Sequence, residues 1–233
     1  MITTATILSG VAQGLIWAIL TLGVYLTFRI LDIADLTVEG TFPLGAAVTV
    51  VLINTGMSPA MAMLCALLAG AAAGFITGFL HTIFQIPAIL SGILTMIALY
   101  SVNIRIMSDK ATVALEQPSL KTWMLSLLPE GTVSNTVSII LGTVFCLLIV
   151  ALLYYFFGTE IGCAVRATGS NQNMARSLGV KTDRVIILGL MISNALVALS
   201  GSLIAQLDYG SALVTMGQGT IVIGLASVII GEV

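Results

Sequence analysis

The sequence predicts an all-α polytopic membrane protein, a bundle of helices that cross the bilayer with short connections. Hydrophobic residues make up 58% of the 233 residues and charged residues only 8%, against about 25% charged residues in an average soluble domain. The mean hydropathy is +1.14. Because each crossing takes roughly 20 apolar residues, a chain of this length holds about six to eight spans. We therefore expect one transmembrane domain over residues 1–233.

The charge and cysteine content exclude several classes of function. With a net charge of −2, the chain has no basic field for neutralising phosphates, so we expect no nucleic-acid partner. Cys65, Cys146 and Cys163 have no metal-ligand spacing, and no carboxylate–histidine cluster predicts a metal. The N-terminus has no basic region before its apolar stretch, so it is typical of a retained first span.

The first apolar run covers about residues 4–28, and a polar interval with two acids, Asp35 and Glu39, follows it. The second run, Leu44–Asn54, is about eleven residues long and too short to cross alone. Either the run extends back through Leu36–Phe42, or the helix is broken within the membrane near 32–43.

The third run, Pro59–Phe84, contains Gly70, Gly74 and Gly78. This i, i+4, i+8 spacing predicts a smooth strip on one helix face for close packing. The fourth run, Ile86–Met107, follows directly.

A mixed-charge loop, Ser108–Asn135, separates the two halves of the chain. Its LKTWMLSLL stretch favours a short interfacial helix anchored by Trp123. The fifth run is Thr136–Phe157. The sixth, Val185–Leu207, places Asn194, Ala198, Gly201 and Ala205 on one small-residue face.

The seventh run, Gly219–Val233, ends without a polar tail, so we expect the native chain to continue by one or two further helices. EGTFPLGAAVTVV (Glu39–Val51) is similar to QGTIVIGLASVII (Gln218–Ile230) in its Gly-Thr pair and two later small residues. This pattern indicates an internal repeat, as duplicated halves are common in transporters. Chance similarity between two glycine-rich segments is the alternative.

The longest polar interval between apolar runs is Phe157–Arg184, which we call the basic loop (158–184). It holds four of the eight basic residues: Arg166, Arg176, Lys181 and Arg184. The pattern predicts a capped helix over Gln172–Leu178, started by Ser170 or Asn171 and ended by Gly179 in a left-handed cap. Thr182 or Asp183 is then expected to cap a helix that begins near Val185. Such a compact turn is typical of a docking surface; a merely solvated basic loop is the alternative.

Positive residues also predict the orientation. If the basic loop is cytoplasmic, alternation of the spans places Arg29 inside and the Ser108–Asn135 loop outside. Five basic residues then lie inside and three outside, with the N-terminus outside.

The candidates for an internal path are the polar residues at membrane depth: Asp35, Glu39, Asn103 and Asn194. Charged groups there are costly and tend to face a cavity or the protein interior. Asp35 and Glu39 share one face if that stretch is helical. The alternatives are interfacial solvation for the two acids and helix–helix hydrogen bonding for the two asparagines.

Enzyme chemistry is not predicted. His81 is the only histidine and has no nucleophile arranged with it, and no Gly-x-x-x-x-Gly-Lys loop is present for ATP phosphates. No series of acids runs through the spans, so we expect the energy for transport to come from another polypeptide.

Four blocks carry a resemblance to a known family: Phe28–Val48, Leu90–Met107, Gly162–Arg184 and Gly219–Val233. They resemble permease subunits of ATP-binding-cassette (ABC) importers in the branched-chain amino acid and ribose superfamily, and look most like the tryptophan/tyrosine-type branch. The resemblance covers nearly the whole chain except Ser108–Asn135, and members of that branch run past the position of Val233.

The resemblance implies a bacterial plasma-membrane protein that works as a homodimer with two ATPase subunits and an external substrate-binding protein. The permease itself is then non-catalytic and holds no cofactor, because the partner ATPase binds ATP and Mg²⁺. A coupling helix falls on Ala164–Ala175, with Gly169 allowing a tight turn. The implied contacts with the ATPase are Arg166, Ala167, Thr168, Gly169, Ser170, Asn171, Met174 and Ala175.

The transported solute is then a small molecule such as an amino acid, with an aromatic one implied only by the resemblance. A sugar- or nucleoside-type ABC permease and a self-powered carrier or channel are the alternatives.

Overall fold

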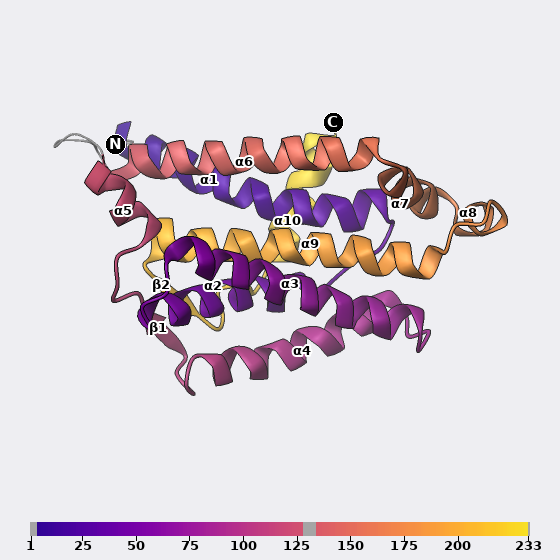
Figure 1. Cartoon of the computed structure of the whole chain (residues 1–233), viewed down its shortest axis with the longest axis horizontal. Helices are drawn as coiled ribbons and strands as arrows, with labels where there is room; N and C mark the ends of the chain where they lie inside the picture. The colour runs from indigo at the N-terminus through magenta and orange to yellow at the C-terminus, as the bar shows by residue number, and fades with distance from the viewer. Residues whose placement is uncertain (1–3, 128–133, 233) are drawn as a thin grey trace.

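The computed structural model describes residues 4–127 and 134–232 and is almost entirely helical, as predicted (Figure 1). The long helices are α1 (Thr4–Tyr25), α2 (Val38–Asn54), α3 (Pro59–Thr82), α4 (Ala88–Ile106), α6 (Ser134–Gly158) and α9 (Thr182–Ile204). The shorter helices are α5 (Leu120–Leu127), α7 (Glu160–Ser170), α8 (Gln172–Ser177) and α10 (Thr220–Gly231). Two π-helical turns, η1 (Leu26–Ile30) and η2 (Ala205–Tyr209), extend α1 and α9.

Within the described residues, five helices are long and apolar enough to cross a membrane, and α2 and α10 are shorter apolar helices. These seven elements correspond to the seven apolar runs of the sequence. The long helices lie side by side, so the bundle has two ends, which we name by the elements that each carries (Figure 1). The loop end carries α7 and α8, and the strand end carries the start of α1 and a short ribbon of β1 (Thr112–Ala114) and β2 (Ser211–Leu213).

The antiparallel β1–β2 ribbon was not predicted. It pairs Val113 with Ala212, which lie far apart in the sequence, so no local pattern marks it. The side chain of Asn54 at the end of α2 donates to the carbonyl of Ala114 at 2.8 Å. The ribbon thus closes the strand end over α2.

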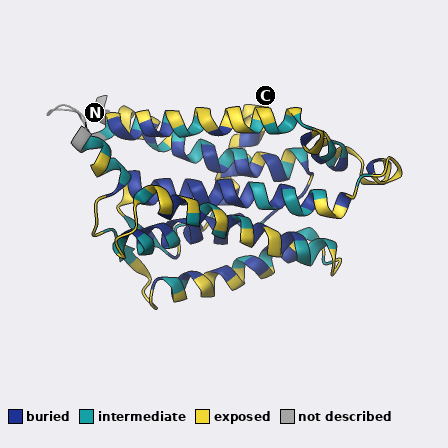
Figure 2. Cartoon of the chain, viewed as in Figure 1, coloured by how far each residue is buried: buried dark blue, intermediate teal, exposed yellow. Residues whose placement is uncertain are grey.

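Helix α9 is the central element of the bundle, and its membrane window is 72% buried, far more than that of any other span (Figure 2). The predicted glycine strip of α3 packs directly on it. A Cβ at Gly74 would overlap the Leu190 carbonyl, and one at Gly78 would lie 2.9 Å from Ile187 Cα. The strip therefore brings two helix backbones into contact, which is the packing mode that stabilises membrane helices.

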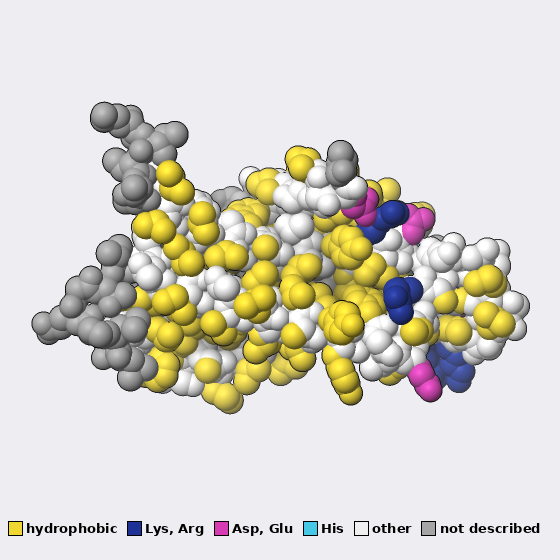
Figure 3. All heavy atoms as spheres, turned by 90° about the horizontal axis from the view of Figure 1, so that it is seen from above, with side chains coloured by type: hydrophobic (Ala, Val, Ile, Leu, Met, Phe, Trp, Pro, Cys, Tyr) yellow, Lys and Arg dark blue, Asp and Glu magenta, His cyan; other side chains and the backbone are white. Residues whose placement is uncertain are grey.

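Hydrophobic side chains cover the outside of the bundle. Leu68 on α3, Ile89 on α4 and Leu147 on α6 are each more than half exposed, as expected for surfaces that face lipid. Seen from above, hydrophobic side chains cover the long middle of the molecule, and charged side chains gather toward the loop end (Figure 3).

Both sequence interpretations of the polar interval after α1 are borne out in part, because α2 extends back to Val38 and the residues before it are non-helical. Residues 31–37 are non-helical and run back into the bundle from the loop end, and α2 then continues to the strand end. Leu31 packs on Gly189, whereas Phe42 and Gly45 farther along pack on Gly201 and Ala198 of α9. Residues 31–54 therefore follow α9 from the loop end to the strand end.

Helix α10 is a second half-helix, and it points the other way. It begins beside the start of α2, where the backbone N–H of Gly219 donates to Glu39 at 3.0 Å. It ends at the loop end, where Glu232 forms an ion pair with Arg29. The two segments of the predicted repeat thus occupy equivalent places, since each starts a half-helix deep in the bundle and the two run to opposite ends.

Replacing Gly74 with leucine is expected to destabilise the bundle by about 1–3 kcal/mol, because the new side chain forces α3 away from the α9 backbone. Unfolding of the purified protein in mixed micelles of increasing SDS content measures this loss. Gly10→Leu is the matched control, because a Cβ at Gly10 of α1 meets nothing within 4 Å and unfolding should stay at the wild-type SDS content. Equal loss in both variants contradicts the packing role of Gly74.

Candidate functional site

The basic loop folds into two short helices at the loop end. The side chain of Thr159 caps α7 by accepting from the Gly162 N–H, and that of Asn171 caps α8 by accepting from the Met174 N–H. Gly179 has a φ of +86°, so the left-handed cap predicted after α8 is confirmed. Of the two residues proposed to start α8, Asn171 does so.

The predicted start of the following helix was wrong. Helix α9 begins at Thr182, not near Val185, and no side chain caps it. Both residues expected to cap it instead accept from Arg176 of α8, whose guanidinium donates to Thr182 Oγ1 at 2.7 Å and to Asp183 Oδ1 at 2.8 Å. Both expected capping groups are therefore engaged in holding α8 against α9.

The segment Ala164–Ala175, expected as one coupling helix, is two helices. Asn171 between them is extended, with φ −159° and ψ 102°. Gly169 is helical and does not form the tight turn expected of it. A Cβ at Gly169 would overlap the Ile30 carbonyl, so this glycine allows α7 to pack directly on the end of η1.

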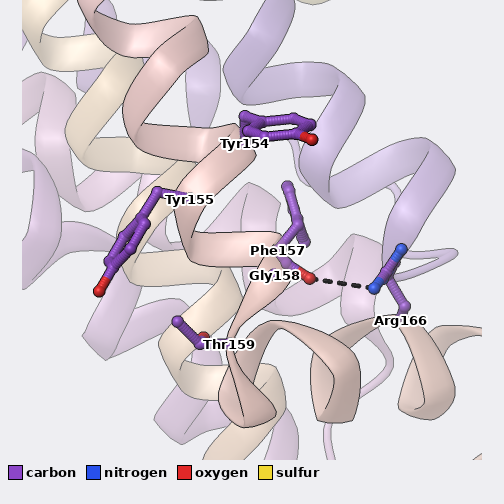
Figure 4. Close-up of a pocket in the computed structure, with 6 residues that line it drawn as sticks. All are labelled: Tyr154, Tyr155, Phe157, Gly158, Thr159 and Arg166. Atoms are coloured by element: carbon purple, nitrogen blue, oxygen red, sulfur yellow. Dashed lines mark hydrogen bonds between the residues drawn. The ribbon is translucent and has the colours of Figure 1, made fainter.

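Arg166 fastens α7 to the end of α6. Its guanidinium donates to the Phe157 carbonyl at 3.0 Å, across a hollow lined also by Tyr154, Tyr155 and Thr159 (Figure 4). The two tyrosines are 85% and 76% exposed, a position typical of aromatic residues at a membrane–water interface. The basic loop therefore begins where α6 leaves the membrane.

The eight residues expected to contact an ATPase differ in exposure. Arg166, Ser170, Asn171 and Met174 are exposed, Ala167 and Gly169 are half-buried, and Thr168 and Ala175 are buried. The exposed apolar pair of α8 is Met174, 50% exposed, and Leu178, 73% exposed. Sequence reasoning missed Leu178, although its i, i+4 spacing from Met174 on a polar helix was a usable signal.

Arg29 lies at the loop end, in a surface hollow that it shares with Arg166, Gly169 and Ser170. The structure thus brings together the basic residues that the alternation of spans places on one side. Arg105, in the last turn of α4, and Lys110, between α4 and β1, lie at the other end.

Two of the four predicted path residues, Asp35 and Asn194, form a buried pair. Asn194 Nδ2 donates to Asp35 Oδ2 at 2.7 Å, and Thr41 Oγ1 donates to Asn194 Oδ1 at 2.7 Å. The other oxygen of Asp35 accepts from the Thr37 N–H at the start of α2. With Asp35 3% exposed and Asn194 fully buried, this pair anchors the non-helical segment to α9.

Glu39 and Asn103 lie on the other side of the first turn of α2. Because α2 begins at Val38, Asp35 precedes the helix and does not share a helix face with Glu39, contrary to the conditional i, i+4 interpretation. Glu39 caps α10, and Asn103 Nδ2 donates to the Gly40 carbonyl at 3.1 Å. Both line a cavity of about 270 Å³ together with Tyr100 and Gln218.

Other polar candidates have local structural roles. The ring of His81 pairs with the Ile86 carbonyl at 2.8 Å and closes the turn between α3 and α4. The three cysteines are free, and no group of three metal-ligating side chains occurs among residues 4–127 and 134–232.

Comparisons with known proteins agree on one family. A family model described as the permease component of branched-chain amino acid transport systems matches residues 6–233. The tyrosine transport system permease protein of Clostridioides difficile (strain R20291) is 43% identical over 225 residues, which are 97% of this chain and 72% of that protein. No solved structure matches the chain.

Two further relatives are more distant. The uncharacterized protein RP368 of Rickettsia prowazekii is 38% identical over 226 residues, or 97% of this chain and 76% of that protein. The autoinducer 2 import system permease protein LsrC of Photorhabdus laumondii is 28% identical over 235 residues, or 99% of this chain and 66% of that protein.

Replacing Asn194 with leucine is expected to destabilise the protein by about 1–3 kcal/mol, because the buried Asp35 carboxyl loses its partner. Asp35→Leu with Asn194→Leu should recover part of that loss, since neither polar group is then left alone. Unfolding in SDS mixed micelles over the full double-mutant cycle measures the coupling. Strictly additive effects contradict the proposed anchoring.

Proposed function

Because the chain belongs to the family of permease components of branched-chain amino acid transport systems, we propose that it takes up an amino acid, driven by ATP hydrolysis in a separate subunit. It is a multi-pass protein of the bacterial inner membrane, and its relatives are transport subunits. In this proposal two copies of the chain form the path, an external binding protein delivers the solute, and the ATPase holds ATP and Mg²⁺.

The observation that carries the ATPase contact is the apolar pair Met174 and Leu178. Both side chains are at least half exposed, and they lie in the basic loop, beyond the ends of α6 and α9. Both residues lie outside the candidate membrane spans, and exposed apolar groups outside a membrane commonly mark a protein contact. A groove on an ATPase subunit that accepts α8 accounts for them.

The attachments of the loop favour transmission of force into the bundle. Arg166 ties α7 to the end of α6, Gly169 seats α7 on η1, and Arg176 ties α8 to α9. A displacement of α7 and α8 by a moving ATPase therefore acts on three membrane elements at once. Gating by rigid movement of this kind needs no bond chemistry in the permease.

An amino acid is the preferred solute, because the relative described as a tyrosine permease is 43% identical, whereas the autoinducer 2 permease is 28% identical. A sugar-type solute is the second candidate, and the autoinducer 2 relative and a fructose import permease of Bifidobacterium longum, 27% identical, favour it. Transport of radiolabelled tyrosine and fructose by the complete system discriminates between the two.

A photo-crosslinking residue in place of Leu178 is expected to capture a subunit that carries a Gly-x-x-x-x-Gly-Lys nucleotide loop, because α8 enters its groove. The full-length protein is labelled in its native cells, and the captured chain is identified by mass spectrometry. The same residue in place of Leu147, exposed in the middle of α6, is the matched control and should capture no such subunit.

Leu178→Asp should reduce uptake about tenfold or more while membrane insertion is unchanged, since a charge replaces an apolar contact. This position is a cleaner test than Gly169, where a larger side chain would also displace α7 from Ile30. Wild-type uptake by Leu178→Asp, or capture of the nucleotide-binding subunit only from Leu147, would overturn the docking proposal.

A further inference from the structure

We propose that the cavity between α2, α4 and the segment leading into α10 binds a protonated amine of the transported solute. The inference rests on the proposed transport function and names the chemical group that this site recognises. It concerns the cavity lined by Glu39, Tyr100, Asn103 and Gln218, where the two half-helices begin.

Asn103 is the first indication that the cavity takes a ligand. The residue is fully buried on α4, and its Nδ2 donates to the Gly40 carbonyl. Its Oδ1 has no hydrogen-bond partner. Among the described residues it is the only buried side-chain oxygen or nitrogen that lacks one. A buried acceptor without a donor costs free energy, more so at membrane depth, and a bound hydrogen-bond donor removes that cost.

Glu39 determines the sign of the charge on the ligand that the cavity can accept. One of its oxygens accepts from the Gly219 N–H at the start of α10, so the positive end of that helix already has its anion. The carboxylate still offers acceptor sites toward the cavity, since each ionised carboxyl has about four. A second anion beside it is disfavoured, whereas a cationic donor is attracted.

The arrangement differs from the usual one at half-helix starts. Such helix ends generally face an anionic group of the solute. Here Asp35 satisfies the N–H of Thr37 at the start of α2, and Glu39 satisfies that of Gly219 at the start of α10. Both helix starts carry acids of the chain itself, so the site is left rich in acceptors.

The remaining walls favour an organic ammonium group over a bare metal cation. The cavity measures about 270 Å³, and Met96, Ile97 and Tyr100 form its apolar side. A bare ion leaves most of that space unfilled. An amine on a hydrocarbon stem places its N–H groups on Asn103 and Glu39 and its carbon atoms against α4, where the Tyr100 ring adds attraction for a cation.

The test uses three probes that share a phenethyl group and differ in the polar group it carries: phenethylamine, 2-phenylethanol and 3-phenylpropionate. Thermal unfolding of the full-length purified chain is followed at increasing millimolar concentration of each. Phenethylamine is expected to raise the midpoint saturably, whereas the neutral alcohol and the anion do not, because only the amine supplies a charged donor.

Asn103→Leu and Glu39→Gln should each weaken phenethylamine binding about tenfold or more, the size expected when a charge-assisted hydrogen bond is lost. Ser101→Ala is the matched control on α4, at an exposed position outside the cavity lining, and should bind as the wild type. If Asn103→Leu does not fold, Glu39→Gln decides, because its amide oxygen still accepts from Gly219.

Equal stabilisation by the amine and the alcohol, or unchanged amine binding in both variants, would overturn the proposal. A metal-cation site would also overturn it. In that case sodium chloride raises the unfolding midpoint saturably, choline chloride does not, and Asn103→Leu abolishes the effect of sodium. This test does not involve the ATPase, so the two proposals can fail separately. Amine-selective binding without a cross-link from Leu178 contradicts only the docking proposal. A cross-link from Leu178 without amine-selective binding contradicts only the amine site.

Discussion

The arrangement of the whole bundle depends on one buried side chain, Asn194 in the middle of α9. A non-helical backbone at membrane depth is tolerated only where other groups satisfy its hydrogen bonds. Asn194 fixes the carboxyl of Asp35 and the hydroxyl of Thr41 on either side of the start of α2, and Asp35 in turn satisfies the Thr37 N–H. This chain of bonds allows residues 31–37 to lie unwound inside the protein.

Helix α9 joins the two regions that the proposals concern, the basic loop and the start of α2. Its first residues are held to α8 by Arg176, and Asn194 lies about 18 Å farther along, from the rise of an α-helix per residue. Close glycine packing leaves α3 and α2 little freedom to slide on it. If an ATPase docks on the basic loop as proposed, its movement would pass along α9 to the start of α2, beside the cavity.

The half-helices α2 and α10 explain why acids occur at membrane depth in a chain with so few charges. Each helix start has backbone N–H groups that need an acceptor, and each receives a carboxyl of the chain, Asp35 for α2 and Glu39 for α10. The Glu39 bond also joins two segments 180 residues apart. The same need of the helix-start N–H groups for an acceptor therefore stabilises the non-helical segment before α2 and makes the cavity polar.

The sequence by itself determined the features that depend on local chemistry. Apolar length placed the seven membrane elements, Asn171 and Gly179 marked the ends of α8, and Gly70, Gly74 and Gly78 predicted a packing face. Only the tertiary structure decided the rest: that Asp35 meets Asn194, that Arg176 engages Thr182 at the start of α9, and that Gly169 packs on Ile30 while Leu178 stays exposed. These outcomes depend on residues distant in the chain, because a polar side chain bonds whichever group the fold brings to it, and local spacing carries no record of that partner.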